Sequence, residues 1–201
     1  MLINLEILAA PLVLSRLLDT VGRSKLYVDG PLLVDDEGLH GMVEKCGQKF
    51  LTAGSHTVYI EGFQAGGGVG MEAKYSGPDT GGKMTYMRSG IIPAQSPAPG
   101  QYYSACDPTV QDGDGSQFTV CMFRSEVSIG QIPALGQADT GLNRLYYIGK
   151  GRMAAVDVHD LGQFRSAVAN TPDVNYAWAI YGTLKIGTAG GYSLCITSDD
   201  G

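Results

Sequence analysis

Residues 24–78 constrain the fold of this chain more than any other stretch. Short runs of alternating apolar and polar residues are separated here by turns rich in glycine and aspartate, such as Asp29-Gly30. A side-chain period of two, interrupted by residues that favour turns, is typical of consecutive antiparallel strands. The stretch therefore predicts an acidic turn at 35–38 and strands at 24–28, 32–34, 48–52, 57–63 and 69–75.

The same pattern returns in the C-terminal part of the chain. Its clearest example is 176–186, where Trp178, Ile180, Leu184 and Ile186 alternate with Ala177, Ala179, Tyr181, Thr183 and Lys185. We also expect a short helix at 161–168, with Asp160 or His159 as its N-cap. Further strands are predicted at 117–125, 144–148 and 192–196.

Two segments do not follow this pattern. Residues 1–23 are rich in leucine and nearly free of glycine, which favours a helical or leader-like extension. Their apolar run is too short and too interrupted by charge and proline to span a bilayer. Residues 79–116 contain several prolines and many small residues, and we expect a surface-crossing connection with one strand at 84–88.

The composition excludes several classes of function. The chain has 201 residues, enough for one core and a small extension, and its 29 glycines and 44% hydrophobic residues indicate a turn-rich globular protein. Its formal net charge is −6, and its few basic residues are scattered. Because nucleic-acid binding relies on basic patches, we expect no nucleic-acid partner.

Catalytic and nucleotide-binding motifs are also missing from the sequence. The glycine run at 66–70 lacks the spacing of a phosphate-binding loop. Asp112 and Asp114 suggest an EF-hand loop, but its twelfth position would fall on Cys121, which cannot replace the required glutamate. The three histidines, His40, His56 and His159, belong to no GxSxG or HExxH motif. We therefore predict that the chain is not an enzyme.

Six segments together resemble a known family of β-sandwich domains. They read YGTLKI and GGYSLCITSDDG near the C-terminus, and SKLYVDG, GLHG, LTAGSHTVYIEGF and GGGVGMEAKYSGP within residues 24–78. This combination resembles the protective-antigen-type domain, named after the fourteen-kilodalton fragment of protective antigen. Such domains recur in adhesins, in some glycosidases and in repeat-bearing surface proteins. The resemblance implies an antiparallel β-sandwich.

The matching segments stand in permuted order. Residues 117–201 resemble the family's first half and residues 24–78 its second half, so Gly201 would continue naturally into Ser24. The chain is either a window from a tandem array or a circularly permuted domain spanning 24–201. Closure of the two halves is favoured, because each half alone would expose sheet edges and an unburied face.

The resemblance makes Asp199 and Asp200 the first candidates for a ligand site. In the adhesin branch of the family the matching aspartates bind calcium, which in turn holds sugar hydroxyls, and a glycine-rich loop that matches Gly67 and Gly68 lies beside them. Adjacent carboxylates suit Ca²⁺, which prefers oxygen ligands. The loop at 65–69 lacks the asparagine that lectin members add. In the alternative interpretation, Asp-Asp-Gly forms only a tight turn.

Other acidic residues and one histidine also have two interpretations. Asp29 and the pair Asp35-Asp36 can form turns by accepting hydrogen bonds from nearby backbone N–H groups, or they can bind a ligand. His40, in the GLHG segment, resembles a family position that is usually structural. We expect its side chain to be satisfied within the fold rather than to bind a ligand.

The four cysteines contain no CxxC pair and predict two disulfides in an oxidising compartment. Cys106 and Cys121 flank a short polar loop that a disulfide could close. If the two halves close as the resemblance implies, Cys46 would lie near Cys195. That bridge would join the halves covalently.

These features together predict a non-catalytic, extracellular or cell-surface module that binds carbohydrate or adheres to other surface proteins, with calcium as a candidate cofactor. The alternatives are a structural repeat or spacer beside neighbouring repeats of the same parent protein, and an accessory domain of a glycosidase.

Overall fold

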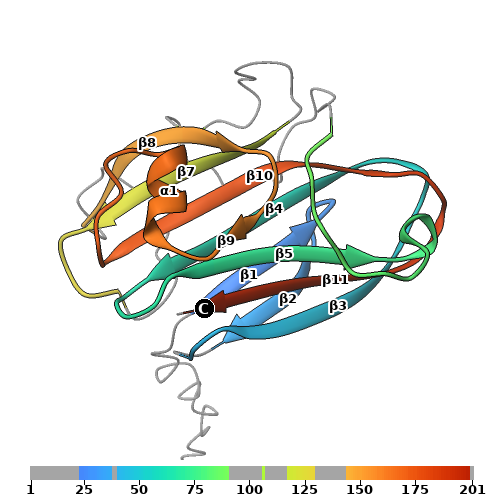
Figure 1. Ribbon diagram of the computed structural model, residues 1–201, viewed down its shortest axis with the longest axis horizontal. Helices are drawn as coiled ribbons and strands as arrows, with labels where there is room; N and C mark the ends of the chain where they lie inside the picture. The colour runs from blue at the N-terminus through green and yellow to red at the C-terminus, as the bar shows by residue number, and fades with distance from the viewer. Residues whose placement is uncertain (1–22, 38–39, 91–105, 107–116, 130–143, 200–201) are drawn as a thin grey trace, which may run out of the picture.

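The structure is a computed structural model that describes residues 23–37, 40–90, 106, 117–129 and 144–199 (Figure 1). Within them the chain forms two antiparallel sheets that pack face to face, which confirms the predicted mostly-β class. The elements are β1 (Arg23–Val28), β2 (Leu32–Glu37), β3 (Val43–Leu51), β4 (Gly54–Gln64), β5 (Gly70–Ser76), a 3-10 turn (Pro78–Thr80), β6 (Thr85–Tyr86), β7 (Phe118–Ser125), β8 (Leu145–Met153), β9 (Asp157–Val158), α1 (Leu161–Ala167), β10 (Tyr176–Ile186) and β11 (Gly190–Asp199).

Both sheets combine strands from the two predicted halves of the domain. The larger sheet has the order β2-β1-β4-β10-β7-β8, and the smaller has the order β3-β11-β5-β6, with β9 also paired to β5. In the larger sheet β4 pairs with β10, and in the smaller sheet β11 lies between β3 and β5. Residues 24–78 and 117–199 therefore complete each other's sheets.

Strand β10 is the centre of the larger sheet, and its bounds match the predicted strand. It pairs with β4 along its whole length, from Tyr176 opposite Gln64 to Ile186 opposite Gly54. One face of β10, including Trp178, packs into the core between the sheets. The opposite face, including Tyr181, is also buried, in a second cluster with Cys106 and Phe123.

Several predicted strands were too short, most clearly β2, β3, β4 and β8, and the predicted acidic turn was wrong. The acidic segment Asp35–Glu37 is not a turn but the end of β2, because it pairs with β1 and the Asp36 carboxylate is satisfied inside the fold. Strands β3, β4 and β8 continue through polar residues and glycines, because backbone pairing with long neighbours extends them. The short strand β9 was not predicted.

Helix α1 was predicted correctly, with Asp160 as its N-cap. The Asp160 carboxylate accepts a hydrogen bond from the backbone N of Gln163 at 2.9 Å. Phe164 packs its ring on Trp178 at a centroid distance of 5.1 Å, which attaches the helix to the core. Among the described residues, no helix is long and apolar enough to cross a membrane. The predicted extension before Arg23 lies outside the described residues, as do Asp112, Asp114 and Asp200.

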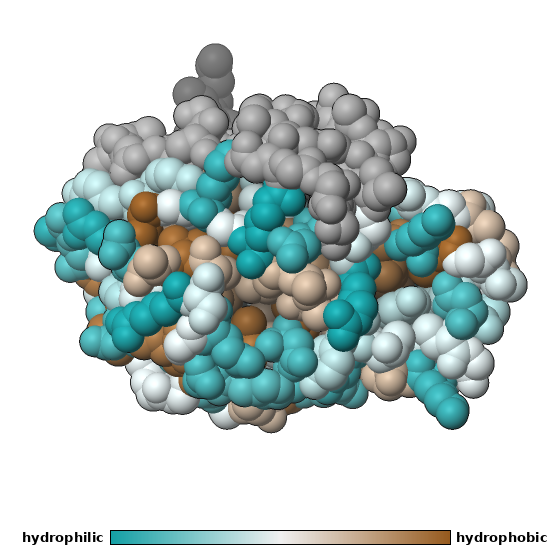
Figure 2. Space-filling view, turned by 45° about the horizontal axis from the view of Figure 1, so that its top comes forward, coloured by the Kyte–Doolittle hydropathy of each residue, from teal (hydrophilic) through white to brown (hydrophobic). Residues whose placement is uncertain are grey.

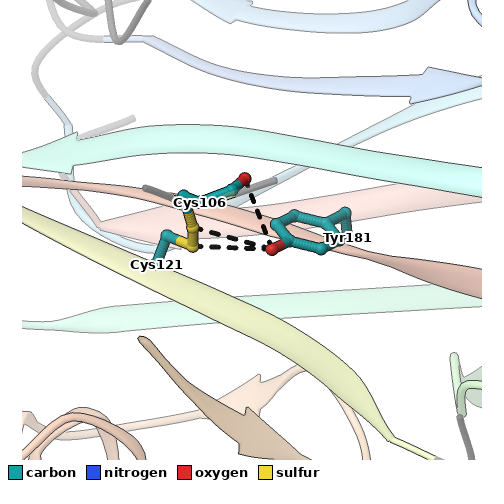
Figure 3. Close-up of a disulfide and its surroundings, with 3 residues drawn as sticks. All are labelled: Cys106, Cys121 and Tyr181. Carbon is teal, nitrogen blue, oxygen red and sulfur yellow. Dashed lines mark hydrogen bonds between the residues drawn. A yellow bond between two sulfur atoms is a disulfide. The ribbon is translucent and has the colours of Figure 1, made fainter. Parts of the chain in front are cut away.

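The structure contains both of the disulfides that the sequence suggested. Cys46 and Cys195 are directly opposite each other in the β3–β11 pair, with a Cα–Cα distance of 4.0 Å. Cys106 and Cys121 have a Cα–Cα distance of 6.2 Å. The hydroxyl of Tyr181 lies beside this second bridge, 3.6 Å and 3.7 Å from its sulfurs, and donates to the backbone oxygen of Cys106 (Figure 3).

Glycine is required where β4 meets the largest buried side chain. Gly62 is directly opposite Trp178, and a Cβ atom added at Gly62 would lie 2.6 Å from Cζ2 of the indole. Trp178 is fully buried, so its ring has little room to move.

We therefore expect Gly62→Ala to lower the free energy of unfolding by about 1–3 kcal/mol, as overpacking of a core does. Gly191→Ala is the matched control in β11, because no atom lies within 4 Å of its added Cβ. The control should change stability by less than about 0.5 kcal/mol. Urea denaturation measures both, and equal stabilities for the two variants would contradict the packing argument.

The Glu61 carboxylate, shared by two tyrosines, joins β1 to β4 on the face of the larger sheet that carries the second buried cluster. The hydroxyls of Tyr27 and Tyr59 donate to the two oxygens of Glu61 at 2.9 Å and 3.0 Å, and their rings lie 5.5 Å apart. Burial, and then the negative charge of Glu61, raise the pKa of the Tyr27 hydroxyl well above its usual value. The fold therefore stabilises the neutral phenol.

This contribution is fully present below the unfolded-state pKa of Tyr27 and is lost as the pH rises toward the folded-state pKa. We expect the free energy of unfolding to decline above about pH 10, and Tyr27→Phe to reduce that decline. Tyr146→Phe, at a ring stacked under Arg124, is the control and should keep the full decline. Urea denaturation across alkaline pH, compared among the three proteins, measures the effect.

Candidate functional site

Asp199 ends β11 beside the loop that joins β4 to β5. It is opposite Gly70 in the β5–β11 pair. Its carboxylate lies against Gly68 so closely that a Cβ atom added at Gly68 would collide with Oδ2. Its other oxygen, Oδ1, would be 3.7 Å from a Cβ atom added at Gly41. The structure thus brings Asp199 to the predicted glycine loop, which includes Gly67. Asp200 lies outside the described residues.

The loop is held in place by a buried side chain. Gln64, at the end of β4, is fully buried and its amide nitrogen donates to the backbone oxygen of Gly68. Gly67 has a φ of 95°, a left-handed conformation that glycine adopts without strain. This anchoring fixes the surface on which the Asp199 carboxylate rests.

The described side chains of this site supply few of the oxygens that calcium needs. Ca²⁺ takes six to eight oxygen ligands, and the Asp199 carboxylate provides at most two. The backbone oxygen of Gly68 already accepts a hydrogen bond from Gln64. Among the described residues, no group of three metal-binding side chains includes Asp199.

One apolar side chain lies beside Asp199. Met42 comes just before Val43, the partner of Ser198 in β3, and its sulfur lies against Gly70, the partner of Asp199 in β5. Met42 is 44% exposed, a high value for a large apolar residue. On the face of the molecule drawn in Figure 2, hydrophobic surface is generally interrupted by hydrophilic side chains. Asp199, Gly67, Gly68 and Met42 together form what we call the Asp199 surface.

A buried polar network joins the start of β1 to the end of β11. Ser24 and Ser198 share a hydrogen bond of 2.8 Å, and Ser198 donates to Oδ2 of Asp36 at 3.2 Å. The other oxygen of Asp36 lies 3.0 Å from Nζ of Lys45 and 3.1 Å from Nε2 of His40. Asp36 therefore has a structural role here, and His40 is satisfied within the fold as the sequence predicted.

The contacts of Asp29 also lie within the fold. It has a φ of 56°, and its carboxylate accepts a hydrogen bond from the backbone N of Thr57 at 3.0 Å. Its second oxygen lies 2.7 Å from Nδ1 of His56, whose other nitrogen is 2.9 Å from the backbone oxygen of Thr52. Asp29 is thus the turn former that the sequence suggested, and His56 fastens that turn.

One cluster of polar side chains was missed by the sequence analysis. Glu72 of β5, Asp157 of β9 and His159 come together at the edge of the smaller sheet, with one ligand atom of each within 4.8 Å of the others. Only the pairing of β5 with β9 brings Glu72 opposite Asp157. The Asp-x-His spacing at residues 157–159 was the single sequence signal available, and this spacing is too common to identify a site.

The network around Asp36 predicts the cost of removing its charge. Asp36 is fully buried, and its carboxylate has four polar or charged side chains within reach, directly or through Ser198. Because hydrogen bonds to charged groups contribute about 1.5–3 kcal/mol each, we expect Asp36→Asn to destabilise the fold by about that amount.

Asp173→Asn is the matched control, since the Asp173 side chain is 81% exposed and pairs only with Arg165 among the contacts described. It should change the free energy of unfolding by less than about 0.5 kcal/mol. Urea denaturation near neutral pH measures both variants. An Asp36→Asn protein as stable as the control would show that the network does not hold the sheets together.

Neither the sequence nor the fold of this chain leads to a known relative. No protein-family model, curated protein or solved structure matches it. Its function must therefore be argued from its own residues.

Proposed function

We propose that this chain is a non-catalytic extracellular module that binds carbohydrate at the Asp199 surface, on a circularly permuted sandwich of the protective-antigen type. The observation that carries the proposal is the contact between the Asp199 carboxylate and Gly68. The sequence resemblance links these two positions, which belong to different halves of the chain. Their contact is what that resemblance requires.

The closure of the two halves supports the permuted fold. The hydrogen bond between Ser24 and Ser198 places the start of β1 beside the end of β11. That is the point where the sequence segments would join if they were continuous. Strands from both halves contribute to both sheets, with β10 next to β4 in the larger sheet and β11 between β3 and β5 in the smaller, as a permuted single domain requires.

The chemistry of the Asp199 surface suits a small polyhydroxylated ligand. A carboxylate accepts charge-assisted hydrogen bonds from sugar hydroxyls. Met42 offers exposed apolar area to the C–H face of a sugar ring. If calcium is bound there, Asp199 and Asp200 would hold it, and it would supply a positive centre for two neighbouring hydroxyls.

The two disulfides support an oxidising compartment. Cys46–Cys195 and Cys106–Cys121 use all four cysteines of the chain. Disulfides persist in secreted and cell-surface proteins and are rare in reducing compartments. We therefore place the module outside the cell or on its surface.

A structural spacer is the second candidate function. One observation favours it: Asp199 belongs to no group of three metal-binding side chains among the residues described. In this case the contact of Asp199 with Gly68 would only shape the end of the sandwich. Binding measurements separate the two candidates.

The test is a glycan-array screen of the full chain with millimolar calcium and with a chelator. The lectin proposal expects binding to at least one class of glycan. Two variants should weaken that binding at least about tenfold: Asp199→Asn, which removes the charge, and Gly68→Ala, whose Cβ displaces the carboxylate.

Asp173→Asn and Gly191→Ala are the respective controls and should bind as the wild type does. Circular dichroism confirms that each variant is folded. Absence of glycan binding by the wild type would reject the lectin proposal and favour the spacer. Binding by both Asp199→Asn and Gly68→Ala that is as strong as that of the wild type would do the same. A calcium-dependent rise in melting temperature that Asp199→Asn abolishes would assign calcium to this surface.

A further inference from the structure

The cluster of Glu72, Asp157 and His159 lies at the edge of the smaller sheet, where β9 runs along β5 (Figure 1). Met71 pairs with Val158 and Glu72 pairs with Asp157, so the two acidic side chains are cross-strand neighbours. His159 follows β9 directly and precedes the N-cap of α1. Three potential metal ligands therefore come from two adjacent strands and the residue that follows one of them.

The ligand atoms of the cluster are close together. Nε2 of His159 lies 2.8 Å from Oδ1 of Asp157 and 3.4 Å from Oε1 of Glu72. All three atoms are within 4.8 Å of one another. Two ligand atoms bonded at about 2.0–2.2 Å to one tetrahedral ion lie about 3.4 Å apart, which the separation of His159 from Glu72 matches and that of His159 from Asp157 approaches.

One contact in the cluster joins two atoms that both suit a metal ion. Oδ1 of Asp157 is shielded from solvent, and Nε2 of His159 lies 2.8 Å from it. A carboxylate oxygen and an imidazole nitrogen are ligands that transition-metal ions take, so a cation can bind both in place of the proton that joins them in an ion pair.

The buried glutamate adds a second reason for a cation. Glu72 is only 7% exposed and lies opposite a second carboxylate, an arrangement that costs free energy unless positive charge compensates both. Lys74 pairs with Oε2 of Glu72, and the hydroxyl of Tyr86 donates to Oε1 at 3.3 Å. Lys74 thus compensates one glutamate oxygen, and the other, Oε1, lies 3.4 Å from Nε2 of His159 as well as accepting from Tyr86.

We propose that Glu72, Asp157 and His159 form a binding site for a divalent transition-metal ion of the zinc class. Imidazole favours such ions over calcium or magnesium, and the carboxylates supply two further ligands. The His159 side chain is 53% exposed, so the ion can enter from solvent and keep water in its remaining positions. Bound metal would fasten β9, and with it the start of α1, to β5.

The metal site goes beyond the proposed carbohydrate function and does not need it. Glu72 is two residues along β5 from Gly70, the partner of Asp199, so the two sites share one face of the sheet. No ligand of the proposed metal site belongs to the Asp199 surface. Asp199→Asn should therefore bind the metal as the wild type does.

The experiment is isothermal titration of ZnCl₂ into chelator-treated full-length protein with its disulfides intact. We expect one Zn²⁺ per chain and a rise in melting temperature with Zn²⁺. His159→Gln and Asp157→Asn should each weaken Zn²⁺ binding at least about tenfold, since even outer-shell changes at metal sites cost that much. His40→Gln is the histidine control and should leave affinity and stoichiometry unchanged.

The visible absorption of bound cobalt provides a second readout. If the role of these residues were purely structural, substituting them would leave this absorption unchanged. Co²⁺ in place of Zn²⁺ should give a visible absorption band that His159→Gln alters and His40→Gln does not, with circular dichroism confirming that each variant is folded. No Zn²⁺ binding by the wild type at millimolar metal would overturn the proposal. Zn²⁺ binding that both cluster variants retain would overturn it equally.

Discussion

The pairing of β10 with β4 is the interaction on which the rest of the structure depends. It is an eleven-residue ladder that joins the two halves of the chain at the centre of the larger sheet. Because β10 is buried on both faces, the core between the sheets and the second cluster around Tyr181 are both built on it. The contact of Asp199 with the glycine loop follows from this closure, since β11 continues from β10 and is inserted between β3 and β5.

Alternation of side chains predicted the strands well because one face of each sheet is buried. It predicted their ends poorly, because cross-strand hydrogen bonds extend a strand through polar residues and glycines. Asp35–Glu37 shows the problem: local preference favours a turn, but Lys45, His40 and Ser198 supply the partners that let Asp36 lie inside. Those partners come from other strands and are invisible to a local pattern.

The two candidate sites differ in how much of them could be predicted. The contact between Asp199 and Gly68 was expected from the family resemblance, which relates the ends of β11 and β4. The cluster of Glu72, Asp157 and His159 was not, because β9 is a two-residue strand with no recognisable period. Its existence depends on the edge of the smaller sheet, and sheet edges are set by the complete topology rather than by any one segment.

The disulfide between Cys46 and Cys195 has a mechanical consequence. Tension applied beyond Asp199 would peel β11 from β3, and the first pair to separate would be Ser198 and Val43. Peeling along that seam would stop at the covalent bond, because Cys195 is directly opposite Cys46. Beyond that point β3 and β11 carry load as one unit, whatever force the domain experiences in its surroundings.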